Sequence, residues 1–188
     1  MKSTEFILEE VTEQNIEEWA WLIKEDCQFY LRQNNPKNFP LYRGLKMEDE
    51  PFLKKRVRLK DRTPKDMNPE LHHELNSYFQ TKFGSPFRNA MFCTGNEAEA
   101  TVYGAYYYVF PRGKFEFIWS PHIDDLFSLW DMHGDEDIFF DEVKNGDYTN
   151  KNLSNAIDSH HEIMIRCNSY YALSAKNENI ASKVINLL

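Results

Sequence analysis

The sequence predicts a mixed α+β domain. Two amphipathic helical patterns with recognisable caps stand among short runs of aromatic and β-branched residues, and the two kinds of element do not alternate regularly. The 188 residues correspond to one domain, and 41% apolar residues, with 15% aromatic residues, suffice for a hydrophobic core. We therefore treat residues 1–188 as a single domain in which residues 1–36 form an N-terminal helical element.

The first expected helix covers residues 13–33. Apolar side chains recur there at three- and four-residue spacing from Ile16 to Leu31. Thr12 is the expected N-cap, and Asn35 followed by Pro36 ends the helix. A short strand is expected next, over residues 39–45.

A basic segment and a second helix follow. Residues 54–65 hold seven Lys or Arg and one Asp with few aliphatic residues, which indicates an exposed loop or an edge strand. The helix is well delimited, because Asn68 is a cap, Pro69 suits the first helical position and Gly84 is a stop signal.

The middle of the chain alternates between short strands and turns. We expect a strand over residues 89–94 and a short helix over residues 97–104. Strands over residues 106–110 and 115–119 flank a turn containing Pro111 and Gly113, so they are expected to pair as a hairpin.

The C-terminal third begins with an acidic stretch. Residues 124–142 contain eight acidic and no basic residues, and their bulky apolar side chains predict an acidic helix and loop. Residues 146–155 are typical of turns, and residues 161–173 predict one or two strands. An amphipathic helix over residues 177–188 would cover an open sheet edge.

The cysteines, the histidines and the lengths of the apolar runs exclude several classes of protein. Cys27, Cys93 and Cys167 have no CxxC spacing, so neither a disulfide framework nor a thiolate zinc site is expected, and the histidines lack metal-ligand spacing. The N-terminus is acidic, and no apolar run approaches ~18 residues. We therefore expect a cytoplasmic protein without a metal or a membrane partner. The net charge of −8 argues against a polyanionic partner only as an average, since the basic and acidic segments are separate.

Three short motifs together point to a chemistry. They are an Arg on a strand in Tyr42-Arg43-Gly44, a hydroxyl at a strand end in Cys93-Thr94-Gly95, and a Glu opening a strand at Glu162. Their order resembles the Arg, Ser/Thr, Glu signature of the ADP-ribosyltransferase family over residues 42–173. Tyr103-Gly104 and the pair Tyr170-Tyr171 agree with it.

The resemblance implies a fold, a co-substrate and a set of roles. The fold would be a split two-sheet core with an N-terminal helix, and the co-substrate would be NAD. Glu162 would stabilise positive charge on the ribose as a carboxylate does in glycosidases, and Arg43 would hold the diphosphate. Thr94 would position Glu162 or the ribose. The NAD site would also include Tyr42, Gly44, Tyr103 and Tyr107, with a tyrosine ring stacked on the nicotinamide.

Two positions depart from the family pattern. His160 occupies the place two residues before the Glu, where many members have Glu or Gln that selects the acceptor, so we assign His160 to the catalytic set and do not favour arginine as acceptor. Cys93-Thr94-Gly95 replaces the usual Ser-Thr-Ser but keeps one hydroxyl. With the basic segment, His160 favours RNA or DNA over protein as the acceptor. The nucleic-acid contacts would be Lys54, Lys55, Arg56, Arg58, Lys60 and Arg62.

The sequence thus predicts a mono-ADP-ribosyltransferase that modifies a macromolecule, with RNA or DNA favoured over protein. It resembles a toxin module or phage-linked effector with an antitoxin partner. An NAD glycohydrolase would use the same residues with water as acceptor. A non-catalytic binding protein is the third possibility. In that case Glu162 would be a surface charge, Arg43 a structural ion pair and Thr94 a strand-end cap, while the basic segment would be a solvated face.

Overall fold

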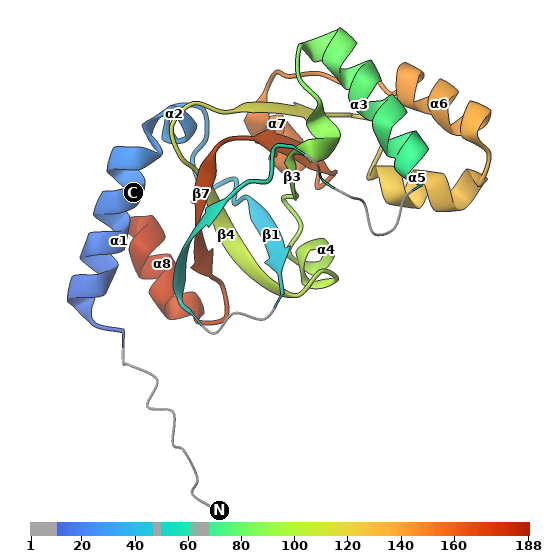
Figure 1. Cartoon of the computed structure of the whole chain (residues 1–188). Coiled ribbons are helices and arrows are strands. Elements are labelled where there is room, and N and C mark those ends of the chain that lie inside the picture. The colour runs from blue at the N-terminus through green and yellow to red at the C-terminus, as the bar shows by residue number, and fades with distance from the viewer. Residues whose placement is uncertain (1–10, 47–49, 61, 63–67) are drawn as a thin grey trace, which may run out of the picture.

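The computed structural model describes residues 11–46, 50–60, 62 and 68–188, and its architecture is α+β with two antiparallel sheets (Figure 1). The four-stranded sheet has the order β1-β4-β7-β2, and the three-stranded sheet has the order β3-β6-β5. The strands are β1 (Tyr42–Leu45), β2 (Phe52–Arg56), β3 (Met91–Cys93), β4 (Ala105–Pro111), β5 (Glu116–Trp119), β6 (Ile163–Arg166) and β7 (Ser169–Ser174). The helices are α1 (Glu13–Asp26), α2 (Gln28–Leu31), α3 (Pro69–Phe83), the 3-10 helix η1 (Phe87–Asn89), α4 (Glu97–Thr101), α5 (Leu126–His133), α6 (Glu136–Asn145), α7 (Leu153–Asp158) and α8 (Glu178–Asn186).

The capping signals expected at Thr12 and Asn68 are confirmed in α1 and α3. Thr12 and Asn15 form a capping box at the start of α1, and Asn68 accepts a hydrogen bond from the Glu70 N–H at the start of α3. The first helix is shorter than expected because it is interrupted at Cys27, whose Sγ contacts the Phe110 carbonyl oxygen at 3.5 Å. The apolar periodicity continues across the break, since Tyr30 in α2 is buried in the same core as Ile16.

The predicted hairpin is wrong. β4 pairs with β1 and β7, whereas β5 pairs with β6 in the other sheet. The intervening turn has tertiary hydrogen-bond partners: the Arg112 N–H donates to the Ser169 carbonyl, and the Gly113 N–H donates to the Asp26 carbonyl. These contacts fix the path of the chain between the two sheets. The turn residues therefore connect two sheets here and do not form the turn of a hairpin.

Other expected elements are present with changed boundaries. The acidic stretch forms the two helices α5 and α6, and β2 of the basic segment is an edge strand that pairs with β7. Residues 161–173 give two strands, β6 and β7, which belong to different sheets. The end of the turn-like region before them overlaps the start of α7, a helix that the sequence did not predict.

Two hydrophobic clusters lie on the two faces of the three-stranded sheet. Ile163 and Ile165 belong to the cluster that also contains the four-stranded sheet, α1 and α8, whereas Met164 belongs to the cluster formed with α3, α5 and α6. Burial on both faces explains the uninterrupted apolar run of β6. The C-terminal amphipathic helix α8 buries Ala181 and Val184 beside α1.

The two sheets are joined at one end. Tyr42 and Thr94 exchange backbone hydrogen bonds of 2.8 and 3.0 Å, so β1 of one sheet meets the end of β3 of the other. We call this junction the seam. Among the described residues, no helix is both long enough and apolar enough to cross a bilayer.

Candidate functional site

Arg43 lies at the seam. It is opposite Tyr107 in the β1–β4 register and on the same face, which is turned toward the core. Its Nη1 donates to the Phe92 carbonyl oxygen at 3.0 Å, so the side chain reaches from the four-stranded sheet to the three-stranded sheet. The neighbouring Gly44 allows the close approach of α4, because a Cβ there would overlap the Ala100 carbonyl oxygen.

Thr94 connects the seam to the segment that carries Glu162. Its hydroxyl donates to the His160 carbonyl oxygen at 2.7 Å and accepts from the Asn96 N–H at 3.1 Å. Gly95 follows because a Cβ at that position would overlap the Ile157 carbonyl oxygen of α7. The Thr-Gly pair therefore has a structural reason, and Thr94 fixes the backbone two residues before Glu162.

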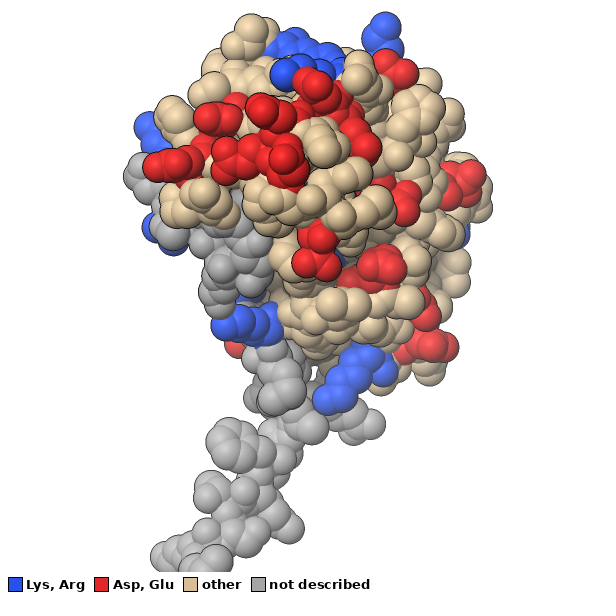
Figure 2. Space-filling view, turned by 90° about the vertical axis from the view of Figure 1, so that its right-hand side faces the viewer, with Lys and Arg blue, Asp and Glu red and all other residues tan. Residues whose placement is uncertain are grey.

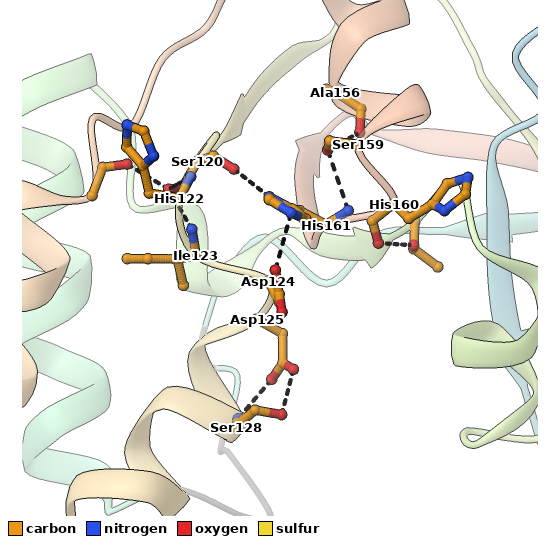
Figure 3. Close-up of polar contacts among 12 residues, drawn as sticks. Ser120, His122, Ile123, Asp124, Asp125, Ser128, Ala156, Ser159, His160 and His161 are labelled. Atoms are coloured by element: carbon orange, nitrogen blue, oxygen red, sulfur yellow. Dashed lines mark hydrogen bonds and ion pairs between the residues drawn. The ribbon is translucent and has the colours of Figure 1, made fainter.

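His160 takes part in this contact through its backbone. Its φ of +66° is uncommon for a residue other than glycine, and it directs the carbonyl toward Thr94. The imidazole is exposed and points away from the neighbouring His161 (Figure 3). The structure thus gives the His160 backbone a positioning role, and a catalytic role of its ring stays a prediction.

Glu162 stands immediately before β6 and is mostly buried. Its backbone N–H donates to the Asp124 carbonyl at 2.6 Å, and its Oε1 lies 3.1 Å from Nη1 of Arg88. Burial raises the pKa of the Glu162 carboxyl above the ordinary 4.5; Arg88 and Arg62 oppose this shift, and Asp125 adds to it. The predicted site carboxylate is therefore in a desolvated, arginine-lined environment.

Arg88 is a site residue that sequence reasoning missed. It lies on η1, it is 7% exposed, and its backbone N–H donates to Asn76 Oδ1 of α3 at 2.9 Å. An arginine next to an expected buried strand is a weak signal for a buried ion pair. Nothing in the sequence identifies Glu162 as its partner.

Two guanidinium groups pack against the ring of Phe92. Cζ of Arg62 lies 4.1 Å from the Phe92 ring centroid, and Cζ of Arg88 lies 4.5 Å from it, both within cation–π range. Arg62 also donates to the Ala90 carbonyl oxygen. Of the six basic residues predicted to bind nucleic acid, Arg62 thus interacts electrostatically with Glu162. Lys54 on β2 instead helps to lower the pKa of the Asp26 carboxyl, away from the seam.

The other predicted basic contacts follow β2 toward Lys60. Lys54, Arg56, Arg58 and Lys60 are exposed, and Lys55 is half-buried. These side chains stay candidates for phosphate contacts on the edge strand. Lys65, the last basic residue of the segment, lies outside the described residues.

The predicted tyrosines occupy different environments. Tyr107 is 0% exposed, so its ring has no open face for nicotinamide, and burial contradicts the prediction that Tyr107 stacks there. Strand alternation turns Tyr107 into the core. Tyr42 is also buried, and burial raises the pKa of its phenol. Tyr103 is 63% exposed and adjoins Gly44, so it can offer a ring face beside Arg43.

A polar cluster surrounds His161, the residue that precedes Glu162 in the chain (Figure 3). Nε2 of His161 lies 3.0 Å from Asp124 Oδ1, and its Nδ1 lies 2.8 Å from the Ser120 carbonyl oxygen. Ser120 Oγ accepts hydrogen bonds from the N–H groups of His122 and Ile123. The cluster anchors the segment before α5 to the start of β6.

A broad acidic surface covers α5 and α6. Figure 2 shows acidic side chains gathered on one face of the molecule. The exposed acidic residues on these two helices and the turn between them are Asp131, Asp135, Glu136, Asp137, Asp141 and Glu142. In the described part of the chain, no group of three His, Cys, Asp or Glu side chains converges as a metal site.

Comparison with known proteins gives no match to a family model, to a curated protein or to a solved structure. The functional argument therefore depends on the residues of the site.

Proposed function

We propose that this protein is a mono-ADP-ribosyltransferase that moves ADP-ribose from NAD to a macromolecular acceptor, with nucleic acid favoured over protein. The supporting observation is that the Arg, Thr and Glu of the sequence motif meet around one seam between two sheets. Arg43 reaches Phe92 across the seam, and Thr94 holds the backbone that leads to Glu162.

The donor set suits a dinucleotide. Arg43 Nε is buried and has no hydrogen-bond partner among the described residues, so a donor suited to an oxyanion is already present. Arg43 would hold the diphosphate, and Tyr103 would offer an exposed ring to the nicotinamide. NAD supplies an N-glycosidic bond whose cleavage releases neutral nicotinamide.

Glu162 would favour that cleavage. When the bond between ribose C1′ and nicotinamide breaks, positive charge develops on the ribose. Oε1 of Glu162 faces Arg88, and Oε2 would accept a hydrogen bond from a ribose hydroxyl. The acceptor nucleophile then bonds to C1′ and releases its proton to solvent. The carboxylate must be ionised throughout, because its charge is what stabilises the ribose.

The proposal is tested by incubating the protein with adenylate-labelled NAD and cell lysate, followed by separate digestion with nuclease and protease. Macromolecular label that is lost to nuclease and retained after protease supports nucleic acid as acceptor. Label lost to protease alone would refute that preference while keeping the transferase. Nicotinamide release without any macromolecular label would identify a glycohydrolase, and no NAD turnover at all would contradict the enzymatic proposal.

The pH dependence of the reaction should reflect Glu162. Because burial raises the pKa of this carboxyl above 4.5, the active ionised form is lost at a higher pH than for an exposed glutamate as the solution is acidified. We expect the rate of nicotinamide release to fall on the acid side with a midpoint above pH 4.5. Circular dichroism at each pH controls for unfolding. A rate that stays constant down to pH 4.5 would contradict this role.

A further inference from the structure

Three arginine side chains from distant segments meet around Phe92. Arg43 comes from β1, Arg62 from the segment that follows β2, and Arg88 from η1. Arg43 bonds to the Phe92 carbonyl oxygen, while the guanidinium groups of Arg62 and Arg88 lie over its ring. We call these three residues the arginine cluster.

Among the described residues, the arginine cluster has more positive than negative charge. Within the described part of the chain, Glu162 is the carboxylate that contacts it, at 3.1 Å from Arg88, so three positive charges face one negative charge. The pKa of Arg62 is lowered to about 10 by burial and by repulsion from Arg43 and Arg88. Like charges held together in a partly desolvated region cost free energy unless an anion offsets them.

The arginine cluster also contains unused hydrogen-bond donors. Nε of Arg43 and Nε of Arg88 are buried without a hydrogen-bond partner among the described residues. Arg88 itself is more than nine-tenths buried, and such unsatisfied donors are rare in folded proteins. Arg43 and Arg62 are only half-buried, so part of each side chain is accessible to solvent.

We propose that Arg43, Arg62 and Arg88 form a phosphate-binding site whose ligand is a phosphate or diphosphate group of a nucleotide. Planar guanidinium groups match paired phosphate oxygens, so each arginine of the cluster can donate to a phosphate or diphosphate group. Phe92 supports Arg62 and Arg88 through cation–π contacts, which reduce the freedom of both side chains before the ligand binds. The proposed site thus includes Arg62 and Arg88 in addition to Arg43, the arginine of the sequence motif.

The phosphate has two possible sources, the diphosphate of a dinucleotide or the phosphodiester of a nucleic-acid acceptor. The choice between these two sources rests on the proposed function, whereas the anion site does not. An anion on Arg88 would also compete with Glu162 for its guanidinium, so phosphate binding would loosen the ion pair and free the carboxylate.

The test measures binding by the full chain of inorganic pyrophosphate, of ADP-ribose and of a short single-stranded RNA, by calorimetry and thermal melting. We expect pyrophosphate to raise the melting temperature beyond sodium chloride of equal ionic strength. Arg62→Gln should weaken pyrophosphate binding about tenfold or more, because a charge-assisted hydrogen bond is lost. The matched control Arg32→Gln removes an exposed arginine next to α2 and should bind as wild type does.

Arg88 is tested in the double variant Arg88→Gln/Glu162→Gln, which removes both partners of the ion pair and so avoids leaving one charge buried. We again expect a loss of about tenfold or more. Wild-type pyrophosphate affinity in both Arg62→Gln and the double variant would overturn the proposal, as would stabilisation no greater than that by chloride. If the variants lose affinity for ADP-ribose but keep affinity for RNA, the site binds the dinucleotide. If they lose affinity for RNA but keep affinity for ADP-ribose, the site binds the acceptor. Arginine-dependent pyrophosphate binding without any transfer would leave the site standing and reject the transferase.

Discussion

Glu162→Gln is expected to reduce the transfer of ADP-ribose by roughly 10²–10³-fold, the usual effect of removing one preorganised electrostatic group from an active site. Glutamine has the same shape but no charge, so it cannot stabilise the positive ribose. Its amide oxygen can still accept from Arg88, which lies 3.1 Å from Glu162 Oε1 in the wild type. The fold should therefore be retained.

The measurement is the rate of nicotinamide release and of label incorporation, with chemical denaturation run in parallel. Glu136→Gln is the matched control, because it makes the same change at an exposed position on α6. The control should keep the wild-type rate. Wild-type transfer by Glu162→Gln would remove the carboxylate from the mechanism and with it the functional assignment.

Arg88→Gln is expected to have the largest effect on stability. It leaves the Glu162 carboxylate in a desolvated site without its ion-pair partner, and breaking a buried pair in this way typically costs about 3–5 kcal/mol. The side chains of Arg88 and Glu162 are 9% and 17% exposed, so solvent screens the loss only weakly. Chemical denaturation at neutral pH should report the loss directly.

The sign of the pH effect separates charge from packing. A buried carboxylate whose pKa is raised destabilises the folded state above its unfolded pKa, and protonation relieves this penalty as the pH falls through the folded pKa. Arg88→Gln should raise the pKa of Glu162 further, so its stability deficit against wild type should shrink on acidification. The double variant Arg88→Gln/Glu162→Gln should recover most of the loss at neutral pH. A deficit that is equal in the single and double variants would instead assign the loss to packing of Arg88 over Phe92.

Long-range contacts explain residue choices at the site that the motifs alone leave unexplained. Gly44 and Gly95 flank Arg43 and Thr94 because neighbouring backbone comes too close for a Cβ. The sequence showed both glycines as part of the motifs without giving this reason. Tyr107 shows the opposite case: the family resemblance implies a ligand contact there, but the register of β4 turns the ring into the core.

Local patterns by themselves determined the α+β class, the caps of α1 and α3, and which residues are apolar enough to be buried. They left the basic segment open as a loop or an edge strand. These features depend on interactions over a few residues, such as a side chain that caps its own helix or an alternation that matches a strand. The order of Arg43, Thr94 and Glu162 along the chain belongs to the same class, since it needs no knowledge of contacts.

Only the tertiary structure decided how strands are shared between sheets and which charges surround the carboxylate. The turn residues between β4 and β5 predict a hairpin, whereas long-range hydrogen bonds to Ser169 and Asp26 place the two strands in different sheets. Arg88 and Arg62 lie far from Glu162 in sequence, and packing on Phe92 brings them to it. Ion pairs and strand partners are selected by distance in space, which short-range patterns do not encode.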